Sequence, residues 1–102
     1  MNYIIIKVPQ KNDSVSRIVL DGNVYHIRFT YNDTKDFWKF GIMDSAKNPI
    51  VTGIKIVPEI GLNLFYGVKG FPKGKFGVLT KADKVGHDSF ANGDAKFIYV
   101  PK

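Results

Sequence analysis

Residues 17–31 read RIVLDGNVYHIRFTY, and this stretch decides the fold class of the chain. The dipeptide Asp21-Gly22 separates two runs of alternating residues, which is a strong signal for a β-hairpin. Both central residues of a type I′ turn need positive φ angles, and Asp-Gly supplies them. The predicted cross-strand pairs are Leu20 with Asn23, Val19 with Val24, Ile18 with Tyr25, and Arg17 with His26.

This register separates the side chains of the hairpin into two faces, because successive residues of a strand point to opposite sides. One face is apolar and is predicted to be the core: Ile18, Tyr25, Ile27, Phe29 and Tyr31. The other face is polar and carries Arg17, His26, Arg28 and Thr30.

Alternation with period 2 continues on both sides of the hairpin, with turn residues between the segments. The expected strands span residues 3–8, 17–20, 23–31, 37–43, 50–57, 76–81 and 96–100, with polar segments at 10–14 and 82–94. We therefore predict an all-β fold, a small antiparallel sandwich or barrel of about seven short strands in a mostly meander order. Residues 1–102 are expected to form one β domain, in which 1–14 are an N-terminal strand and linker.

Two details are predicted within these strands. Trp38, Phe40 and Ile42 alternate with Lys39 and Gly41, so Trp38 is expected to be buried. In residues 50–57, Ile50, Ile54 and Ile56 are expected to share a face with Thr52, and Gly53 indicates a bulge or a close backbone approach.

Composition limits the class of protein. Of the 102 residues, 44% are hydrophobic and 14% aromatic, which is typical of a globular chain and not of a disordered one. The absence of cysteine excludes disulfides and thiolate zinc sites. No apolar run is long enough for a signal peptide or a membrane span, so we expect a protein made in the cytoplasm without a membrane partner.

The formal net charge of +6 permits attraction to nucleic acid or to acidic protein surfaces. Arg17 and Arg28 are the only arginines, and the lysines are scattered along the chain. Because bidentate recognition of phosphate and guanine depends on arginine, the pattern disfavours nucleic acid as a partner.

No group of residues predicts a catalytic, metal or cofactor site. Residues 70–75 differ from a phosphate-binding loop in glycine spacing and in the absence of a following helix. His87, Asp88 and Ser89 are neighbours in a loop, where a catalytic triad does not normally form. Neither His26 nor His87 has a ligand partner at a short spacing, so no metal is expected. We predict a protein that is not an enzyme.

Two binding surfaces are considered. The segment after residue 58 is rich in apolar side chains that the strands need not cover, and an exposed apolar patch marks a contact surface. Its protein-interface candidates are Ile60, Leu62, Leu64, Phe65, Tyr66, Val68 and Phe71. If these side chains prove to be core, the alternative interface is the basic face with Arg17, His26 and Arg28.

A small nucleic-acid-binding β barrel is the alternative function. Its stacking platform would consist of Tyr25, Phe29, Tyr31, Trp38 and Phe40. These residues alternate on the face already assigned to the core, so we interpret them as packing.

The order of several short motifs resembles one known family. These motifs are Leu20-Asp21-Gly22, Tyr31-Asn32, Trp38, Asn48-Pro49-Ile50-Val51, Gly53-Ile54, Val57-Pro58, Leu62 and the closing Phe97-Ile98-Tyr99-Val100. In this order they resemble the small phage tail baseplate proteins grouped with the cyanophage baseplate plug. The likeness covers about residues 15–100.

The resemblance implies a virion structural protein at the hub end of a contractile tail, encoded by a phage or prophage and without activity of its own. Its partners would be other tail and baseplate proteins, including hub and wedge proteins and copies of itself. The implied location is the tail baseplate of the virion, after assembly in the host cytoplasm.

Overall fold

The computed structural model describes residues 2–63 and 69–101. It contains seven strands: β1 (Ile4–Ile6), β2 (Asp13–Leu20), β3 (Asn23–Asn32), β4 (Phe37–Met43), β5 (Pro49–Ile56), β6 (Lys75–Thr80) and β7 (Ala95–Val100). No helix occurs among the described residues. The all-β prediction is confirmed.

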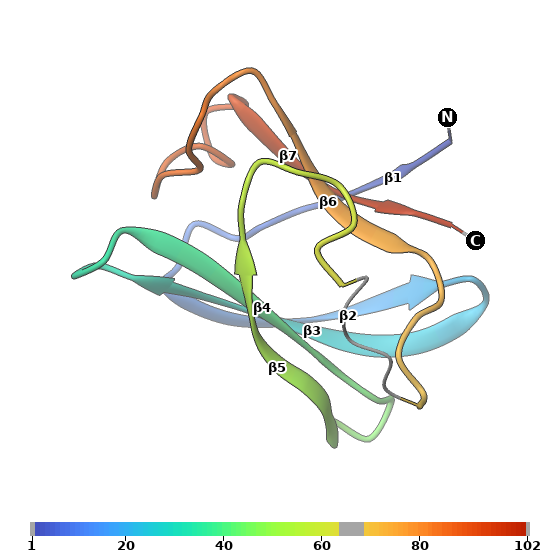
Figure 1. Cartoon of the computed structure of the whole chain (residues 1–102). Coiled ribbons are helices and arrows are strands. Elements are labelled where there is room, and N and C mark those ends of the chain that lie inside the picture. Colours follow the sequence, from blue (N-terminus) through green and yellow to red (C-terminus); the bar gives the residue numbers. More distant parts are fainter. Residues whose placement is uncertain (1, 64–68, 102) are drawn as a thin grey trace.

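The strands form two antiparallel sheets that pack face to face (Figure 1). One sheet is a four-stranded meander in the order β2-β3-β4-β5, and the other has the order β1-β7-β6. The chain thus enters in one sheet, builds the second and returns to the first, which places the two termini side by side in Figure 1. Both sheets have open edges, so the fold is a sandwich and not a closed barrel.

The predicted hairpin is confirmed residue by residue. Leu20 pairs with Asn23, and the register continues without a shift to Asp13 opposite Thr30. Asp21 and Gly22 have φ angles of 52° and 80°, as a type I′ turn requires.

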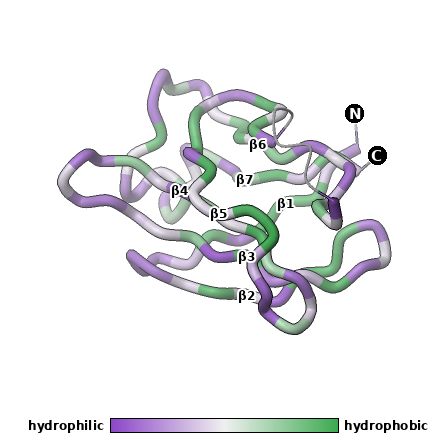
Figure 2. Tube along the Cα trace, turned by 60° about the horizontal axis from the view of Figure 1, so that its bottom comes forward, coloured by the Kyte–Doolittle hydropathy of each residue, from purple (hydrophilic) through white to green (hydrophobic). Residues whose placement is uncertain are grey.

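The core between the sheets is built largely from aromatic side chains. Phe97 of β7 meets Phe29 and Phe40 of the opposite sheet edge to face, at centroid distances of 5.1 and 5.0 Å. Trp38 is fully buried, as predicted. Edge-to-face pairs hold rings in defined orientations, so these contacts fix one sheet against the other. Figure 2 shows hydrophobic colour along β1 and β5 and hydrophilic colour at most loop tips.

Two predictions at the strand level are wrong. The segment expected as a polar linker at 10–14 ends early, because β2 already begins at Asp13, whose carboxylate binds the Arg28 side chain. In β5, Val51 is buried and Thr52 is exposed, since a register shift separates the pairs formed by Phe40 and Ile42. The bulge indicated by Gly53 accounts for this shift, and Gly53 has a φ angle of 72°.

Candidate interaction surfaces

The predicted apolar interface is divided by the structure. Ile60 is 41% exposed, whereas Leu62 and Phe71 are only 7% and 8% exposed and belong to the core. The expectation of partial exposure therefore holds for Ile60 and is wrong for Leu62 and Phe71. Leu64, Phe65, Tyr66 and Val68 lie outside the described residues.

Leu62 and Phe71 are buried because the chain is fastened to β6 on either side of residues 64–68. The Asn63 side chain is buried; its amide donates to Gly74 O at 3.0 Å and its oxygen accepts from Phe76 N at 2.9 Å. The Phe71 ring meets the Phe76 ring edge to face at 5.9 Å. These contacts hold Leu62 and Phe71 in the core. The hydrophobicity of the segment alone could not show whether these two side chains are buried or exposed.

An apolar surface does exist on the outer side of the three-stranded sheet. Ile5, Ile98 and Gly77 form one row across β1, β7 and β6. Ile5 is 54% exposed. The Ile60 side chain covers Gly77, since a Cβ atom added there would lie 3.0 Å from Ile60 Cγ1. We call the exposed Ile5 and Ile60, with the fully buried Ile98 between them in this row, the apolar face.

Lysines border this apolar face. Lys75 pairs with Val100, and Lys96 pairs with Leu79, in the rows on either side of Ile98. Both lysines are exposed. Strand alternation places them on the same outer side as Ile98. The surface is thus an apolar centre with a positive border.

The outer side of the four-stranded sheet carries the alternative interface. Arg17 pairs with His26, and strand alternation places both on the same outer side as Arg28. Across the sheet, Lys39 of β4 pairs with Lys55 of β5. We call this set the basic face: Arg17, His26, Arg28, Lys39 and Lys55.

Two members of the basic face have partners. The Arg28 guanidinium donates to both oxygens of Asp13 at 2.9 and 2.6 Å, and this hydrogen bonding lowers the pKa of the Asp13 carboxyl. His26 Nδ1 lies 3.1 Å from Asp44 O. The pKa of Asp44 is lowered mainly by the backbone N–H of Asn48, which donates to its carboxylate.

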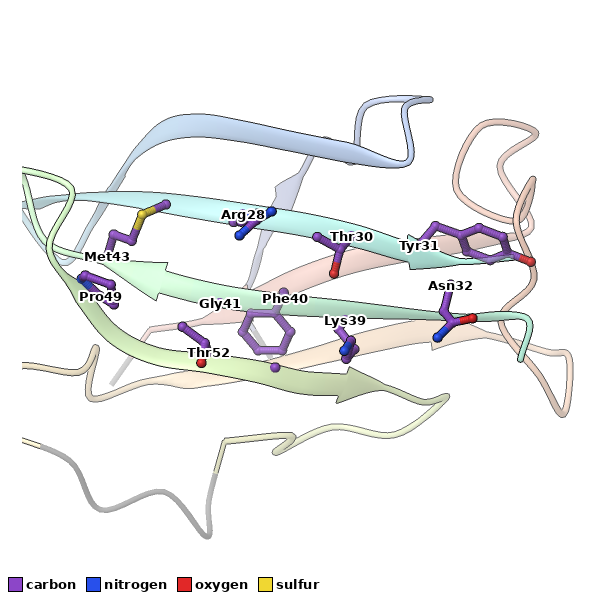
Figure 3. Close-up of a pocket in the computed structure, with 11 residues that line it drawn as sticks. Arg28, Thr30, Tyr31, Asn32, Lys39, Phe40, Gly41, Met43, Pro49 and Thr52 are labelled. Carbon is purple, nitrogen blue, oxygen red and sulfur yellow. The ribbon is translucent and has the colours of Figure 1, made fainter. Parts of the chain in front are cut away.

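A hollow of about 580 Å³ lies in the middle of the basic face. Its floor is β4 at Gly41, where a Cβ atom would lie 3.1 Å from Val51 O. Figure 3 shows Arg28 and Thr30 on β3, Lys39 on β4 and Thr52 on β5 around Gly41. The β5 backbone thus packs closely on Gly41, and the hollow lies among the side chains of Arg28, Thr30 and Lys39, which can donate hydrogen bonds.

The aromatic residues considered as a stacking platform are packed inside the sandwich. Phe29, Trp38 and Phe40 are at most 1% exposed, and Tyr25 and Tyr31 pack against the core from its margin. Bases could not stack on these buried rings.

His87 makes contacts that differ from those of a catalytic triad. Its Nδ1 lies 3.1 Å from Asp88 Oδ1, and its Nε2 lies 3.1 Å from Asn12 Oδ1. Ser89 Oγ instead accepts from Gly86 N at 2.8 Å. The imidazole stacks on Trp38 with an interplanar angle of 4°. These contacts fasten the segment after β6 to the sandwich.

Residues 2–63 and 69–101 contain neither a candidate metal site nor a candidate membrane-spanning helix. Over these ranges, histidine, aspartate and glutamate side chains form no group of three that could hold a metal ion. The same part of the chain contains no helix with the length and apolarity to cross a membrane.

The sequence profile described as cyanophage baseplate Pam3 plug gp18 matches residues 1–102. The chain belongs to this family. Among curated proteins, none matches it. Membership in the baseplate plug family indicates a structural role in a phage tail baseplate, with other baseplate proteins as partners.

Proposed function

We propose that this baseplate plug protein is a non-enzymatic subunit of a contractile tail, docked on hub and wedge proteins through its apolar face. Family membership supports the baseplate role. The exposure of Ile5 and Ile60 is the observation that supports this face as the docking surface. Large apolar side chains gain about 25 cal/mol per Å² when a partner removes them from water. In this proposal the subunit joins the tail in the host cytoplasm and remains in the virion.

The lysine border defines the kind of neighbour. Two copies meeting through the same face would bring Lys75 and Lys96 against the like charges of the other copy. A neighbour with an apolar patch and a border of carboxylates avoids this repulsion. Docking on a different baseplate protein is therefore favoured over pairing with a second copy.

Substitution of the apolar face tests the proposal. Ile5→Asp and Ile60→Asp should leave the melting temperature within a few degrees of the parent, because Ile5 and Ile60 are already 54% and 41% exposed to water. Each should stop incorporation of the protein into tails, measured by quantitative mass spectrometry of purified particles. Ile4→Asp is the matched control, since Ile4 is 42% exposed and its side chain points to the side of β1 opposite Ile5. Normal incorporation of both isoleucine variants would refute the proposed surface.

The remaining interface candidates receive the same test. We propose that Leu64, Phe65, Tyr66 and Val68 extend the contact made by Ile60. Leu64→Ser or Phe65→Ser should then preserve thermal stability and prevent incorporation into tails. Unfolding of the domain by either substitution would instead assign that residue to the core.

A further inference from the structure

The basic face holds more positive charge than the sheet itself can compensate. Its basic side chains come from β2, β3, β4 and β5, whereas Asp13 is the acid that these strands place on the same side. That carboxylate is already occupied by the bidentate Arg28 contact. Lys39 and Lys55 lie in the same row as Asp13, but Thr30 separates Lys39 from that occupied carboxylate, and Arg17 pairs with His26.

The pair formed by Lys39 and Lys55 shows the excess most clearly. Like charges directly opposite each other in an antiparallel pair destabilise a sheet. Both ammonium groups lie near the Phe37 ring, at 5.8 and 5.0 Å from its centroid, which offsets part of the repulsion. Among the described residues, neither lysine forms a salt bridge. A carboxylate placed between them would relieve the remaining repulsion.

The hollow at Gly41 provides the space for such a carboxylate. It lies beside the lysine pair, and Arg28, Thr30 and Lys39 line it with side chains that can donate hydrogen bonds (Figure 3). Met43 and Pro49 give its other end an apolar wall. An extended chain laid across β4 could insert an acidic side chain among Arg28, Thr30 and Lys39 and rest its backbone on the neighbouring strands.

We propose that the basic face binds an extended acidic segment of a neighbouring protein, seated over the hollow at Gly41. This surface is additional to the apolar face, which lies on the other sheet. Charge complementarity selects the occupant, because a second copy would present the same positive face and be repelled.

Nucleic acid fits this face less well. Arg28 is committed to Asp13, which leaves Arg17 as the other arginine available for bidentate phosphate contacts. The Phe37 ring, which could stack on a base, is already flanked by Lys39 and Lys55. A flexible acidic peptide makes use of lysine ammonium groups without requiring either feature.

The isolated protein allows a direct test by nuclear magnetic resonance, with a short poly-L-glutamate peptide as the probe. The amide chemical shifts of Thr30, Lys39, Gly41 and Lys55 are expected to change first as the peptide is added. Lys39→Glu should weaken binding roughly tenfold while keeping the fold, because the new carboxylate faces Lys55. Lys96→Glu, on the other sheet, is the matched control and should change the affinity little.

Three results would overturn the proposal in this test. The first is a set of chemical-shift changes centred on Lys96, and the second is an equal loss of peptide affinity in both variants. The third is that single-stranded oligothymidylate binds to the same residues more tightly than the peptide does. None of these results depends on incorporation into tails. The outcome for the basic face is therefore distinguishable from the outcome for the apolar face.

Assembled tails provide the second test. Carbodiimide coupling joins a lysine amine to a carboxylate as an amide, and the reagent takes up the water released. Mass spectrometry should identify cross-links from Lys39 or Lys55 to aspartate or glutamate of a different baseplate protein. Cross-links solely to other copies of this chain, or none from either lysine while Lys96 reacts, would contradict the proposal.

Discussion

At the scale of single residues, Tyr99 joins the two sheets through one buried hydroxyl. It donates to Asp21 Oδ2 at 2.6 Å, in the hairpin turn of the four-stranded sheet, and accepts from Gly74 N at 2.7 Å beside β6. Gly74 must remain glycine, since a Cβ atom there would lie 2.5 Å from the Tyr99 hydroxyl. Burial raises the pKa of Tyr99, and the hydrogen bond to Asp21 raises it further.

Tyr99→Phe is expected to lower the free energy of unfolding by about 1–3 kcal/mol, because it leaves the Gly74 N–H without its acceptor. The pKa of Tyr99 is higher in the folded state than the unfolded value of about 10, so the stabilisation is complete below about pH 10 and is lost as pH rises through the folded pKa. The stability difference between parent and variant should therefore shrink at strongly alkaline pH in thermal unfolding experiments.

Tyr3→Phe is the control for this experiment, because Tyr3 is 41% exposed and its substitution should have little effect at any pH. A second tyrosine also titrates at high pH. The Tyr31 hydroxyl donates a hydrogen bond to the Asp36 carboxylate, and this bond raises the pKa of Tyr31 to about 12. That contribution to alkaline unfolding is present in the parent and in both variants. A difference between parent and Tyr99→Phe that stays constant up to the alkaline limit would contradict the assigned role.

At the scale of elements, the segment between β6 and β7 is the part that the sequence predicted least well. Residues 82–94 were expected to be a polar loop, yet Val85 is 3% exposed and Phe90 packs on the core. Trp38 Nε1 donates to Gly86 O at 3.1 Å, and Lys84 forms a salt bridge with Asp36. Val85 and Phe90 are isolated apolar residues in a polar stretch, so they form no periodic pattern. The sequence pattern therefore could not show that this segment packs beside Trp38.

The hairpin shows the opposite case. Asp21-Gly22 specifies its own turn geometry, and the alternation on both sides fixes the register without help from distant residues. The candidate surfaces fall between these extremes. Sequence identified Ile60 and the basic side chains of β2 and β3, but it missed Ile5, Lys39 and Lys55. Their grouping depends on which strands become neighbours.

Trp38→Phe tests whether the tryptophan fastens this segment as a unit. The change removes one hydrogen bond to Gly86 O and part of the ring that stacks on His87, so unfolding should become easier by about 1–2 kcal/mol. Hydrogen exchange should accelerate at Asn92 N and Ala95 N, whose bonds lie in or beside the segment. The β2–β3 amides serve as the internal control. Uniform acceleration across both sheets would mean that the segment is not a separate unit.

At the scale of the whole molecule, the two sheets protect one shared core and present two different outer sides. The apolar face and the basic face lie on opposite layers of the sandwich (Figure 1). A small subunit with this arrangement can contact two neighbours at once without changing its fold. Binding through two surfaces also raises the effective affinity of a subunit held in an assembly.

The positive charge of the whole molecule leads to the last prediction. With a net charge of +6, the protein should bind duplex or single-stranded DNA at low salt, because phosphate attraction needs no built site. The lysines are spread over both sheets and the loops, so few of them can contact one backbone together. Binding measured by fluorescence anisotropy should therefore disappear at physiological salt. Submicromolar affinity for a defined oligonucleotide at that salt would instead favour a nucleic-acid-binding role, with the basic face as the surface to substitute first.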